Sequence, residues 1–251
     1  LSELEKARYA MMNSVAAMQI KAQGALSIDD TLLSHAGKHF EEIAYLYDHS
    51  QGCYTWAHNL VTLHYSDDVT DYPLKFELWR PADLDKIEAG LVAAEVKLKA
   101  SKQELKQSAP DKWRQYLLGV WRRHQKDPKV AALYESKLRI AERLVTQWMT
   151  LHPDLSLPVT FDSWYTEPGF CHYLDQQLHL AYVGSLQDDA KLQLKTGETT
   201  VLEFAMRLKA EQQQAMANQQ PAPFRPISIH YKGGKEHYFS YCATHRLNHF
   251  G

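Results

Sequence analysis

The sequence predicts an α/β core followed by a second β-rich region. Three observations predict this class. Residues 42–80 alternate in polarity and are rich in aromatic and β-branched residues, as strands are. Residues 82–152 have the three- and four-residue apolar spacing of helices. Two short apolar runs are interpreted as strands: residues 25–30, which end in two aspartates, and residues 156–161, which are followed by one aspartate.

Composition limits the possible classes of protein. The 251 residues carry a formal net charge of −2, so any attraction to nucleic acid must come from a local basic surface. Three cysteines without a CxxC spacing argue against a disulfide framework and favour a reducing cytosol. We find no long apolar run and no signal sequence, so neither a transmembrane nor a secreted protein is expected. The chain begins without Met and is interpreted as a piece of a longer protein.

The first third is expected to form one helix and a meander of strands. An amphipathic helix is predicted over residues 1–22, ended by Gly24. The strand 25–30 is expected to give way to a turn over 31–38. Strands are predicted at a segment containing Ile43, Tyr45 and Tyr47, at 54–65 and at 72–79, with a hairpin turn at 48–52. Consecutive strands usually pair, so these strands should join the strand 25–30 in one sheet.

The middle of the chain is predicted to be helical and basic. We expect helices near 83–107, 111–124 and 128–151. Residues 97–143 contain 13 Lys or Arg against 5 Asp or Glu, a local excess of +8. Its densest point, Arg122 and Arg123 with Lys126 close by, is a candidate DNA-binding surface, because cations placed on phosphates release counterions. The alternative is an ordinary solvated helix face.

The last part should return to strands. A helix is predicted over 167–177, with Pro168 in its first turn, and a strand over 178–186. Residues 211–220 are rich in Gln and Ala and are expected to form a loop or a frayed helix. Extended structure is predicted at 198–208, 226–232 and 237–246.

Three carboxylates are the candidate catalytic residues: Asp29, Asp30 and Asp162. Carboxylates at the ends of neighbouring strands offer the hard oxygen ligands that Mg²⁺ prefers. Such a site supports in-line displacement at phosphorus without a histidine or cysteine nucleophile. An aspartate after a strand is also typical of a turn or a helix cap, so each residue has a purely structural reading.

Two phrases carry a resemblance to a known family. Asp29, Asp30 and Thr31, together with residues 161–165, resemble the first and second acidic motifs of DDE-type transposases of bacterial insertion sequences. Those enzymes belong to the retroviral-integrase superfamily and have an RNase H-like core. The resemblance covers most of residues 20–185 and includes shorter phrases. These are Gly37-Lys38, residues 47–49, residues 58–61 and residues 72–74.

The resemblance implies an RNase H-like mixed sheet flanked by helices, with a basic helical insertion and a late β-rich insertion. The implied organisation is a helix at 1–24 leading into the core, a catalytic core at 25–186 that includes the basic segment 97–143, and a β-rich insertion or continuation of the core at 187–251. It also implies that Asp29 and Asp162 bind Mg²⁺ or Mn²⁺. The acid-x-Thr pattern favours Asp29 over Asp30, and adjacent strand residues point to opposite faces, so one of the two should face Asp162.

The family's third acid, a Glu on a late helix after Tyr and Arg, has no match here. Glu203 lies in a run interpreted as extended, and Glu211 opens a polar stretch. We expect the third acid to lie beyond Gly251 in a longer parent, or to be missing, in which case this chain alone is inactive.

The leading hypothesis from the sequence is a transposase catalytic domain. It would cleave double-stranded DNA at transposon ends and join the ends to target DNA. It would act in the bacterial cytoplasm, at the nucleoid, with no membrane association and as a homodimer on DNA. The alternative is a transposase-derived protein, or an incomplete copy, that binds DNA without cutting it. A third reading is an unrelated α/β enzyme in which the acids coincide by chance.

Two further patterns have competing readings. His35 and His39 are four residues apart and Cys171 precedes His172, which suggests zinc, but Gly37 favours a turn over a helix that would align the histidines. Trp164 and Tyr165 either stack on a base or pack the following helix against the sheet.

Overall fold

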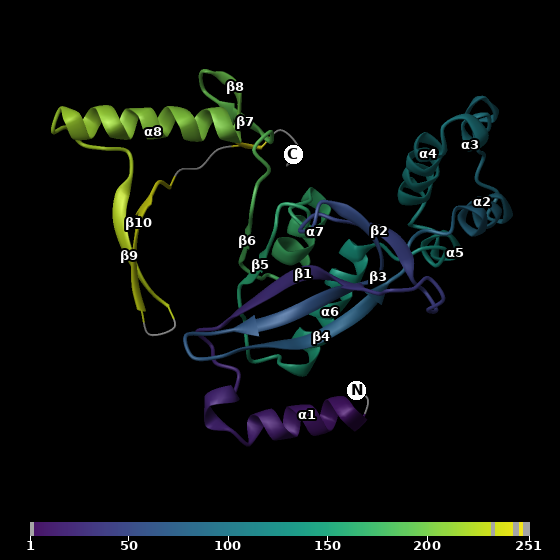
Figure 1. Cartoon of the computed structure of the whole chain (residues 1–251), viewed down its shortest axis with the longest axis horizontal. Helices are drawn as coiled ribbons and strands as arrows, with labels where there is room; N and C mark the ends of the chain where they lie inside the picture. The colour runs from purple at the N-terminus through teal and green to yellow at the C-terminus, as the bar shows by residue number, and fades with distance from the viewer. Residues whose placement is uncertain (1–2, 232–233, 243–245, 248–251) are drawn as a thin grey trace. The chain divides into compact units, whose positions relative to one another are not determined.

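The structure is a computed structural model that describes residues 3–231, 234–242 and 246–247 (Figure 1). The chain forms two compact units. The first comprises Leu1–Asp29, Thr62–Lys75 and Leu144–Gly251, and the second comprises Asp30–Val61 and Phe76–Arg143. No helix among the described residues is long and apolar enough to cross a membrane.

The central element is a six-stranded mixed sheet in the order β2-β3-β1-β5-β6, with β4 also paired to β3. The pairs β1–β5 and β5–β6 are parallel, whereas β2 and β3 are antiparallel. The mixed sheet flanked by helices confirms the predicted fold class and agrees with an RNase H-like core. The strands are β1 (Ala25–Ser34), β2 (Ala44–Asp48), β3 (Cys53–Ser66), β4 (Asp71–Trp79), β5 (Val159–Phe161) and β6 (Tyr182–Gly184).

In the first unit, apolar residues of the parallel strands form the buried side of the sheet. Leu26 and Ile28 of β1 and Val159 of β5 are fully or almost fully buried. Phe161 packs against Phe170 of the next helix, with ring centroids 5.3 Å apart. Helices that belong wholly or partly to this unit are α1 (Glu3–Asn13), α6 (Lys137–Leu151), α7 (Pro168–His172) and α8 (Val201–Ala217).

Helix α7 begins as the sequence predicts. Pro168 occupies its first turn, where a missing N–H costs nothing, and the Glu167 side chain accepts a hydrogen bond from the Phe170 N–H. A π-helical turn at Tyr173–Gln177 completes the segment predicted as a helix over 167–177. The strand expected over 178–186 is limited to β6.

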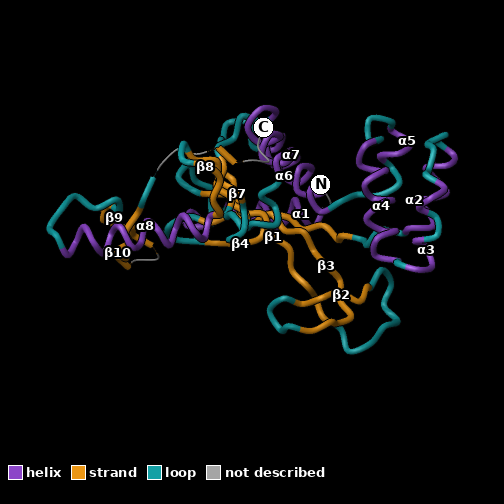
Figure 2. The backbone as a smooth tube through the Cα atoms, turned by 90° about the horizontal axis from the view of Figure 1, so that it is seen from above, coloured by secondary structure: helices purple, strands orange, loops and turns teal. Residues whose placement is uncertain are grey.

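In the second unit, α2 (Leu84–Ala93), α3 (Leu105–Ser108), α4 (Pro110–Arg123) and α5 (Pro128–Ala131) lie side by side (Figure 2). Buried Trp113, Leu117 and Trp121 of α4 form their common core with residues of α2 and α5. The Trp121 Nε1–H donates to the Val130 carbonyl at 3.0 Å, so this indole is buried without losing its hydrogen bond. This group contains its own hydrophobic core.

Two of the predicted helices are interrupted. The helix expected over 83–107 ends after Ala93, because Glu95 adopts a left-handed φ of 60° and the chain then turns back over the core. The helix expected over 128–151 is divided into α5 and α6. The helix predicted at 111–124 is confirmed as α4.

The expected turn after residue 30 is wrong. Strand β1 continues through Asp29 and Asp30 to Ser34, because the 14-residue strand β3 lies beside it in the sheet and gives it pairing partners. The His35 N–H still donates to the Trp56 carbonyl, at 2.8 Å. The two early acids therefore lie within a strand and not at its end.

The expectation of extended structure at 198–208 is also wrong beyond residue 200. Strand β8 (Gly197–Thr200) leads directly into α8. The Thr200 hydroxyl accepts a hydrogen bond from the Glu203 N–H, and the Glu203 carboxylate accepts one from the Thr200 N–H, a reciprocal capping box. The Gln/Ala-rich segment continues this helix to Ala217. Of the two predictions for 211–220, a frayed helix therefore agrees better with the structure than a loop.

The remaining strands include one that the sequence did not predict, β7. Strand β7 (Lys191–Leu194) pairs with β8 and with β11 (Arg246–Leu247). The antiparallel strands β9 (Arg225–Tyr231) and β10 (Gly234–Ser240) confirm the extended structure predicted at 226–231 and 237–240, whereas residues 241–242, also predicted as extended, are not in a strand. Residue 232 and residues 243–245, which the sequence also predicted as extended, lie outside the described residues.

An aspartate whose side chain is only 1% exposed fixes the turn between β3 and β4. The Asp67 carboxylate accepts hydrogen bonds from the N–H groups of Val69 and Thr70, at 2.7 and 2.8 Å, and from the Tyr65 hydroxyl at 2.8 Å. The Lys21 ammonium lies 3.2 Å away. Burial alone raises the pKa of Asp67, but these donors outweigh burial and lower its pKa to about 2.

We predict that this turn contributes acid-sensitive stability. Because the pKa of Asp67 falls from 3.8 to about 2 on folding, its contribution is complete above pH 4 and is lost as the pH falls through 2. After allowance for solvent screening, the contribution is about 1–2 kcal/mol. Urea unfolding of the wild type and Asp67→Asn at neutral and acidic pH measures it. Equal losses of stability on acidification in both proteins would contradict the prediction.

Candidate active site

The parallel pairing of β1 with β5 ends one residue before two of the predicted site residues. The register pairs Leu26 with Val159, and Ile28 with Phe161. Asp29 and Asp162 are the next residues on the two chains. Continued by one residue, the register sets Asp29 beside Asp162, at the spacing of neighbouring strands, about 5 Å between backbones.

The two carboxylates share the solvent-facing side of these strands. Leu26 and Ile28 point to the buried side, so Asp29, one residue further on, points to the opposite side. Asp29 and Asp162 are both exposed. The Thr62 hydroxyl donates to the Asp29 carbonyl at 3.1 Å and anchors the backbone of the strand at this point. The site thus combines a fixed backbone with accessible carboxylates.

Asp162 also stabilises the turn that follows β5. Its Oδ1 accepts hydrogen bonds from the N–H groups of Trp164 and Tyr165, at 3.0 and 3.2 Å. The Thr166 hydroxyl lies 3.0 Å from the Asp162 carbonyl and 2.6 Å from the Ser185 carbonyl. The interpretation of Asp162 as a turn-forming residue is therefore confirmed. Because Oδ1 makes both of these bonds, the turn also fixes the direction in which the carboxylate points.

Asp30 has a different environment. Its Oδ2 lies 2.7 Å from the Lys137 ammonium and accepts a hydrogen bond from the Asn59 amide at 2.8 Å. The Lys137 ammonium also lies 4.9 Å from the centre of the Trp79 ring. The side chains of Lys137 and Asp30 are only 15% and 22% exposed, so the pair is largely shielded from water. Asp30 thus joins β1 to α6 within the second unit.

Lys137 and Asn59 are contacts of Asp30 that the sequence did not identify. Asn59 belongs to a phrase on which the family resemblance rests, but nothing in the sequence links it to Asp30. Lys137 is 107 residues from Asp30, and it was counted only as one member of the basic segment. Only the folded chain shows that a cation of the basic segment is paired with a predicted catalytic acid.

A pocket of about 450 Å³ opens next to Asp162. Trp164, Glu167 and Lys191 are among the residues that line it. The Trp164 side chain is 48% exposed, whereas Tyr165 is fully buried and packs toward Phe170 with ring centroids 6.3 Å apart. Of the two readings for these aromatic residues, packing is therefore correct for Tyr165, and Trp164 is available to a ligand.

No third acid joins this site among the described residues, where no three His, Cys, Asp or Glu side chains are grouped to hold a metal ion. Glu203 is used in the capping box of α8, and Glu211 lies further along the same helix, 3.7 Å from Arg207. The expectation that no residue up to Gly251 supplies the third acid therefore stays a prediction. The two carboxylates present still suit Mg²⁺, which needs few protein ligands and keeps its waters.

The zinc reading gains no support within the described residues. His35 contacts His58 at 2.8 Å between ring nitrogens, and not His39. Cys171 is buried, and burial raises the pKa of its thiol, which disfavours the thiolate that zinc binds.

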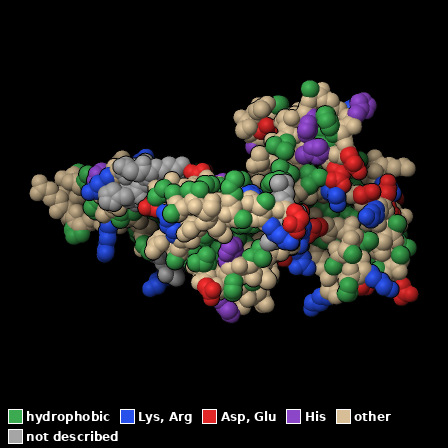
Figure 3. All heavy atoms as spheres, turned by 90° about the horizontal axis from the view of Figure 1, so that it is seen from below, with side chains coloured by type: hydrophobic (Ala, Val, Ile, Leu, Met, Phe, Trp, Pro, Cys, Tyr) green, Lys and Arg blue, Asp and Glu red, His purple; other side chains and the backbone are tan. Residues whose placement is uncertain are grey.

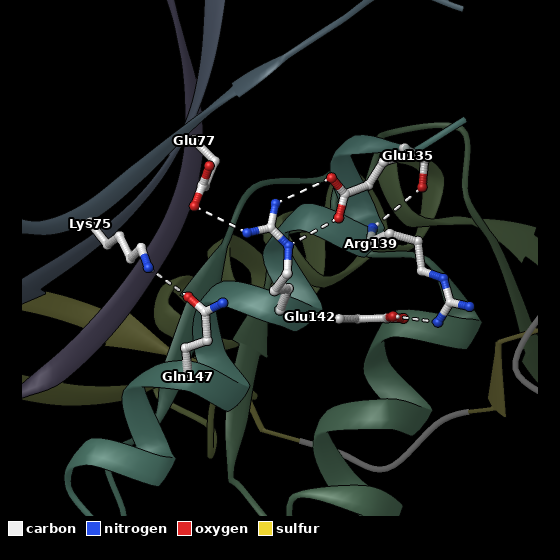
Figure 4. A network of polar contacts seen from close by, with 8 residues as sticks. Lys75, Glu77, Glu135, Arg139, Glu142 and Gln147 are labelled. Atoms are coloured by element: carbon white, nitrogen blue, oxygen red, sulfur yellow. Dashed lines mark hydrogen bonds and ion pairs between the residues drawn. The ribbon is translucent and has the colours of Figure 1, made fainter. Parts of the chain in front are cut away.

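The basic segment is divided between internal ion pairs and exposed cations. Lys106, Lys137, Arg139 and Arg143 contact acids of their own unit. Figure 4 shows the contacts of Glu77 and Glu135, both of which the Arg143 guanidinium reaches at 3.0 Å. On the face shown in Figure 3, Lys and Arg side chains are interspersed with Asp and Glu. The excess of +8 is therefore not one continuous basic patch on that face.

The predicted DNA-binding residues are among the exposed cations. Arg122 and Arg123 lie in the last turn of α4, and Lys126 follows in the turn before α5. Arg123 and Lys126 line a pocket of about 420 Å³ together with Lys97. Glu95 and Asp127 line it too, so its charge is mixed.

We predict that the Lys137–Asp30 pair is structural. Lys137→Met leaves a shielded carboxylate without its cation, so the free energy of unfolding should fall by about 2 kcal/mol. Asp30→Asn should cost a similar amount, and the double variant less than the sum of the two, which a double-mutant cycle by urea unfolding measures. Lys129→Met is the matched control on an exposed lysine. Strictly additive losses would contradict the pairing.

Comparison with known proteins identifies the family. The chain matches no curated protein and no solved structure. A family model described as DDE superfamily endonuclease matches residues 4–201, which is more than half of the chain. That span includes β1, β5 and all three candidate acids. The chain therefore belongs to the DDE superfamily endonuclease family.

Proposed function

We propose that this chain is the catalytic part of a DNA transposase, which cleaves DNA at transposon ends and joins the ends to target DNA. The observation that carries the proposal is the register of β1 and β5, which, continued by one residue, would set the exposed Asp29 beside the exposed Asp162. Membership of an endonuclease family supports DNA as the substrate. The proposal is therefore a phosphodiester cleavage followed by strand transfer.

Asp29 and Asp162 are the proposed ligands of Mg²⁺ or Mn²⁺. A cation held by two carboxylates activates an attacking oxygen and stabilises the leaving oxygen at phosphorus. The turn bonds to Asp162 Oδ1 orient one carboxylate, and the paired backbone of β1 orients the other. We assign Asp30, which the sequence also suggested as catalytic, to positioning β1 through its contact with Lys137.

The proposed partner is double-stranded DNA. Arg122, Arg123 and Lys126 are proposed to bind its phosphates, because all three are exposed cations close together in the chain. Trp164, on the wall of the pocket beside Asp162, is proposed to contact the DNA near the bond that is cut. The family resemblance supports two copies acting together on DNA in the bacterial cytoplasm, with residues 187–251 helping to hold the transposon end.

A second candidate is a DNA-binding protein that does not cleave. The observation that favours it is the use of Glu203 in a helix cap, which leaves the described acidic site with two carboxylates. Two carboxylates bind a cation more weakly than three, so metal occupancy and turnover would both suffer.

The first test is nicking of supercoiled plasmid DNA with Mg²⁺ or Mn²⁺. We expect Asp29→Asn and Asp162→Asn each to lower the nicking rate by about 100-fold or more, because amides are poor ligands for hard cations. Asp154→Asn, on an exposed loop, is the matched control and should be active. Salt-sensitive DNA binding by the wild type without any metal-dependent nicking would favour the second candidate.

The second test is the salt dependence of binding to a duplex. Each of Arg122→Gln, Arg123→Gln and Lys126→Gln should reduce the slope of log affinity against log salt concentration by about 0.9. Arg139→Gln is the matched control, because Arg139 is paired with Glu142 at 3.0 Å. Slopes that match the wild type in all three variants would remove this surface from the DNA interface.

A further inference from the structure

One face of the β2–β3 hairpin carries four aromatic side chains that no part of the proposed cleavage uses. The antiparallel register sets Tyr45 opposite Trp56 and Tyr47 opposite Tyr54. Side chains two residues apart in a strand share a face, so all four rings project from the same side of the hairpin. Tyr45, Tyr47 and Tyr54 are 56%, 41% and 60% exposed. We call these four residues the aromatic face.

The rings of the aromatic face are in mutual contact. The centroids of Tyr45 and Tyr54 are 5.4 Å apart with the ring planes tilted by only 23°. Trp56 lies 5.2 Å from Tyr45, and Tyr47 lies 5.1 Å from Tyr54. The four rings therefore form a continuous row, and the ring of His49 packs on its Tyr47 end with centroids 4.9 Å apart.

The hairpin that carries the rings is fixed at its turn. The buried Asp48 side chain accepts hydrogen bonds from the Ser50 N–H at 2.8 Å and the Ser50 hydroxyl at 2.6 Å. Gly52 supplies the left-handed φ of 67° that brings the chain back into β3. A ligand therefore meets rings that are already positioned, with little ordering cost.

The aromatic face is small for a protein partner. An aromatic side chain presents about 150–250 Å², so the exposed fractions of the three tyrosines amount to about 300 Å². A stable protein interface uses about 800 Å² on each partner. A row of a few rings suits planar ligands that stack one at a time, and nucleic-acid bases are such ligands.

We propose that the aromatic face binds unpaired bases of single-stranded DNA by stacking. This inference rests on the proposed function, which makes DNA the substrate. Bases inside a duplex already stack on their neighbours, so only unpaired bases are free to lie on the rings. The uncharged rings give no preference for a particular sequence, because every base has a flat face. The aromatic face is thus a site for frayed or single-stranded DNA, distinct from the acidic site.

The test compares binding of the whole chain to an oligothymidine single strand and to the matching duplex by fluorescence anisotropy. We expect Tyr45→Ala and Tyr54→Ala each to weaken single-strand binding about tenfold, and to leave duplex binding unchanged. Tyr45→Phe and Tyr54→Phe should bind as the wild type does, because the ring is kept. Tyr45→Leu, which keeps apolar bulk, should bind as weakly as Tyr45→Ala. Phe76→Ala, on an exposed aromatic residue of β4, is the matched control.

Three results would overturn the inference: unchanged single-strand affinity in the Ala variants, an equal loss for duplex, or a change only in oligomeric state by light scattering. Plasmid nicking by the same proteins separates this inference from the proposed function. If the wild type nicks plasmid DNA and the Tyr→Ala substitutions do not change single-strand binding, only this inference is wrong. If single-strand binding depends on the tyrosine rings but the wild type does not nick DNA, only the cleavage proposal is wrong.

Discussion

The pairing of β1 with β5 is the constraint on which the candidate site depends. Three residue pairs, from Leu26–Val159 to Ile28–Phe161, fix the register of two segments that are far apart in the chain. The buried side chains of these pairs prevent a one-residue slip, since such a slip would turn Leu26 and Ile28 toward solvent and Asp29 toward the core. The positions of Asp29 and Asp162 follow from that register, and their backbones need no further contact to be neighbours.

The adjacent acids Asp29 and Asp30 show how one strand can supply two different carboxylates. Asp29 is on the exposed side of β1, whereas Asp30 is on the other side, where Lys137 and Asn59 hold it. Removing one partner of a shielded ion pair leaves the other charge unpaired, and here the pair joins α6 to β1. The aromatic face adds a third kind of surface, which is rigid and uncharged. In the proposals above, the acids would bind cations, the exposed cations of α4 would bind phosphates, and these rings would stack on bases.

Much of the fold follows from local patterns, and most of the site does not. Apolar runs beside aspartate predicted β1 and β5, and Pro168 predicted the start of α7. The end of β1 was missed because its last residues depend on a neighbouring strand and not on their own polarity. The first half of helix α8 was predicted as extended because Thr199, Thr200 and Val201 favour strands, although the sequence contains the Thr200–Glu203 capping box. The Asp30–Lys137 contact spans 107 residues, and no local pattern signals it.

The central claim is that Asp29 and Asp162 hold one shared cation. Iron-directed cleavage of the backbone tests it most directly, because Fe²⁺ bound in place of Mg²⁺ generates radicals that cut the chain only within a few ångströms. We predict cuts at both Asp29 and Asp162, and the loss of both cuts in either single Asp→Asn variant. Cuts near only one of the two residues, or cuts at Asp29 that persist in Asp162→Asn, would contradict the claim.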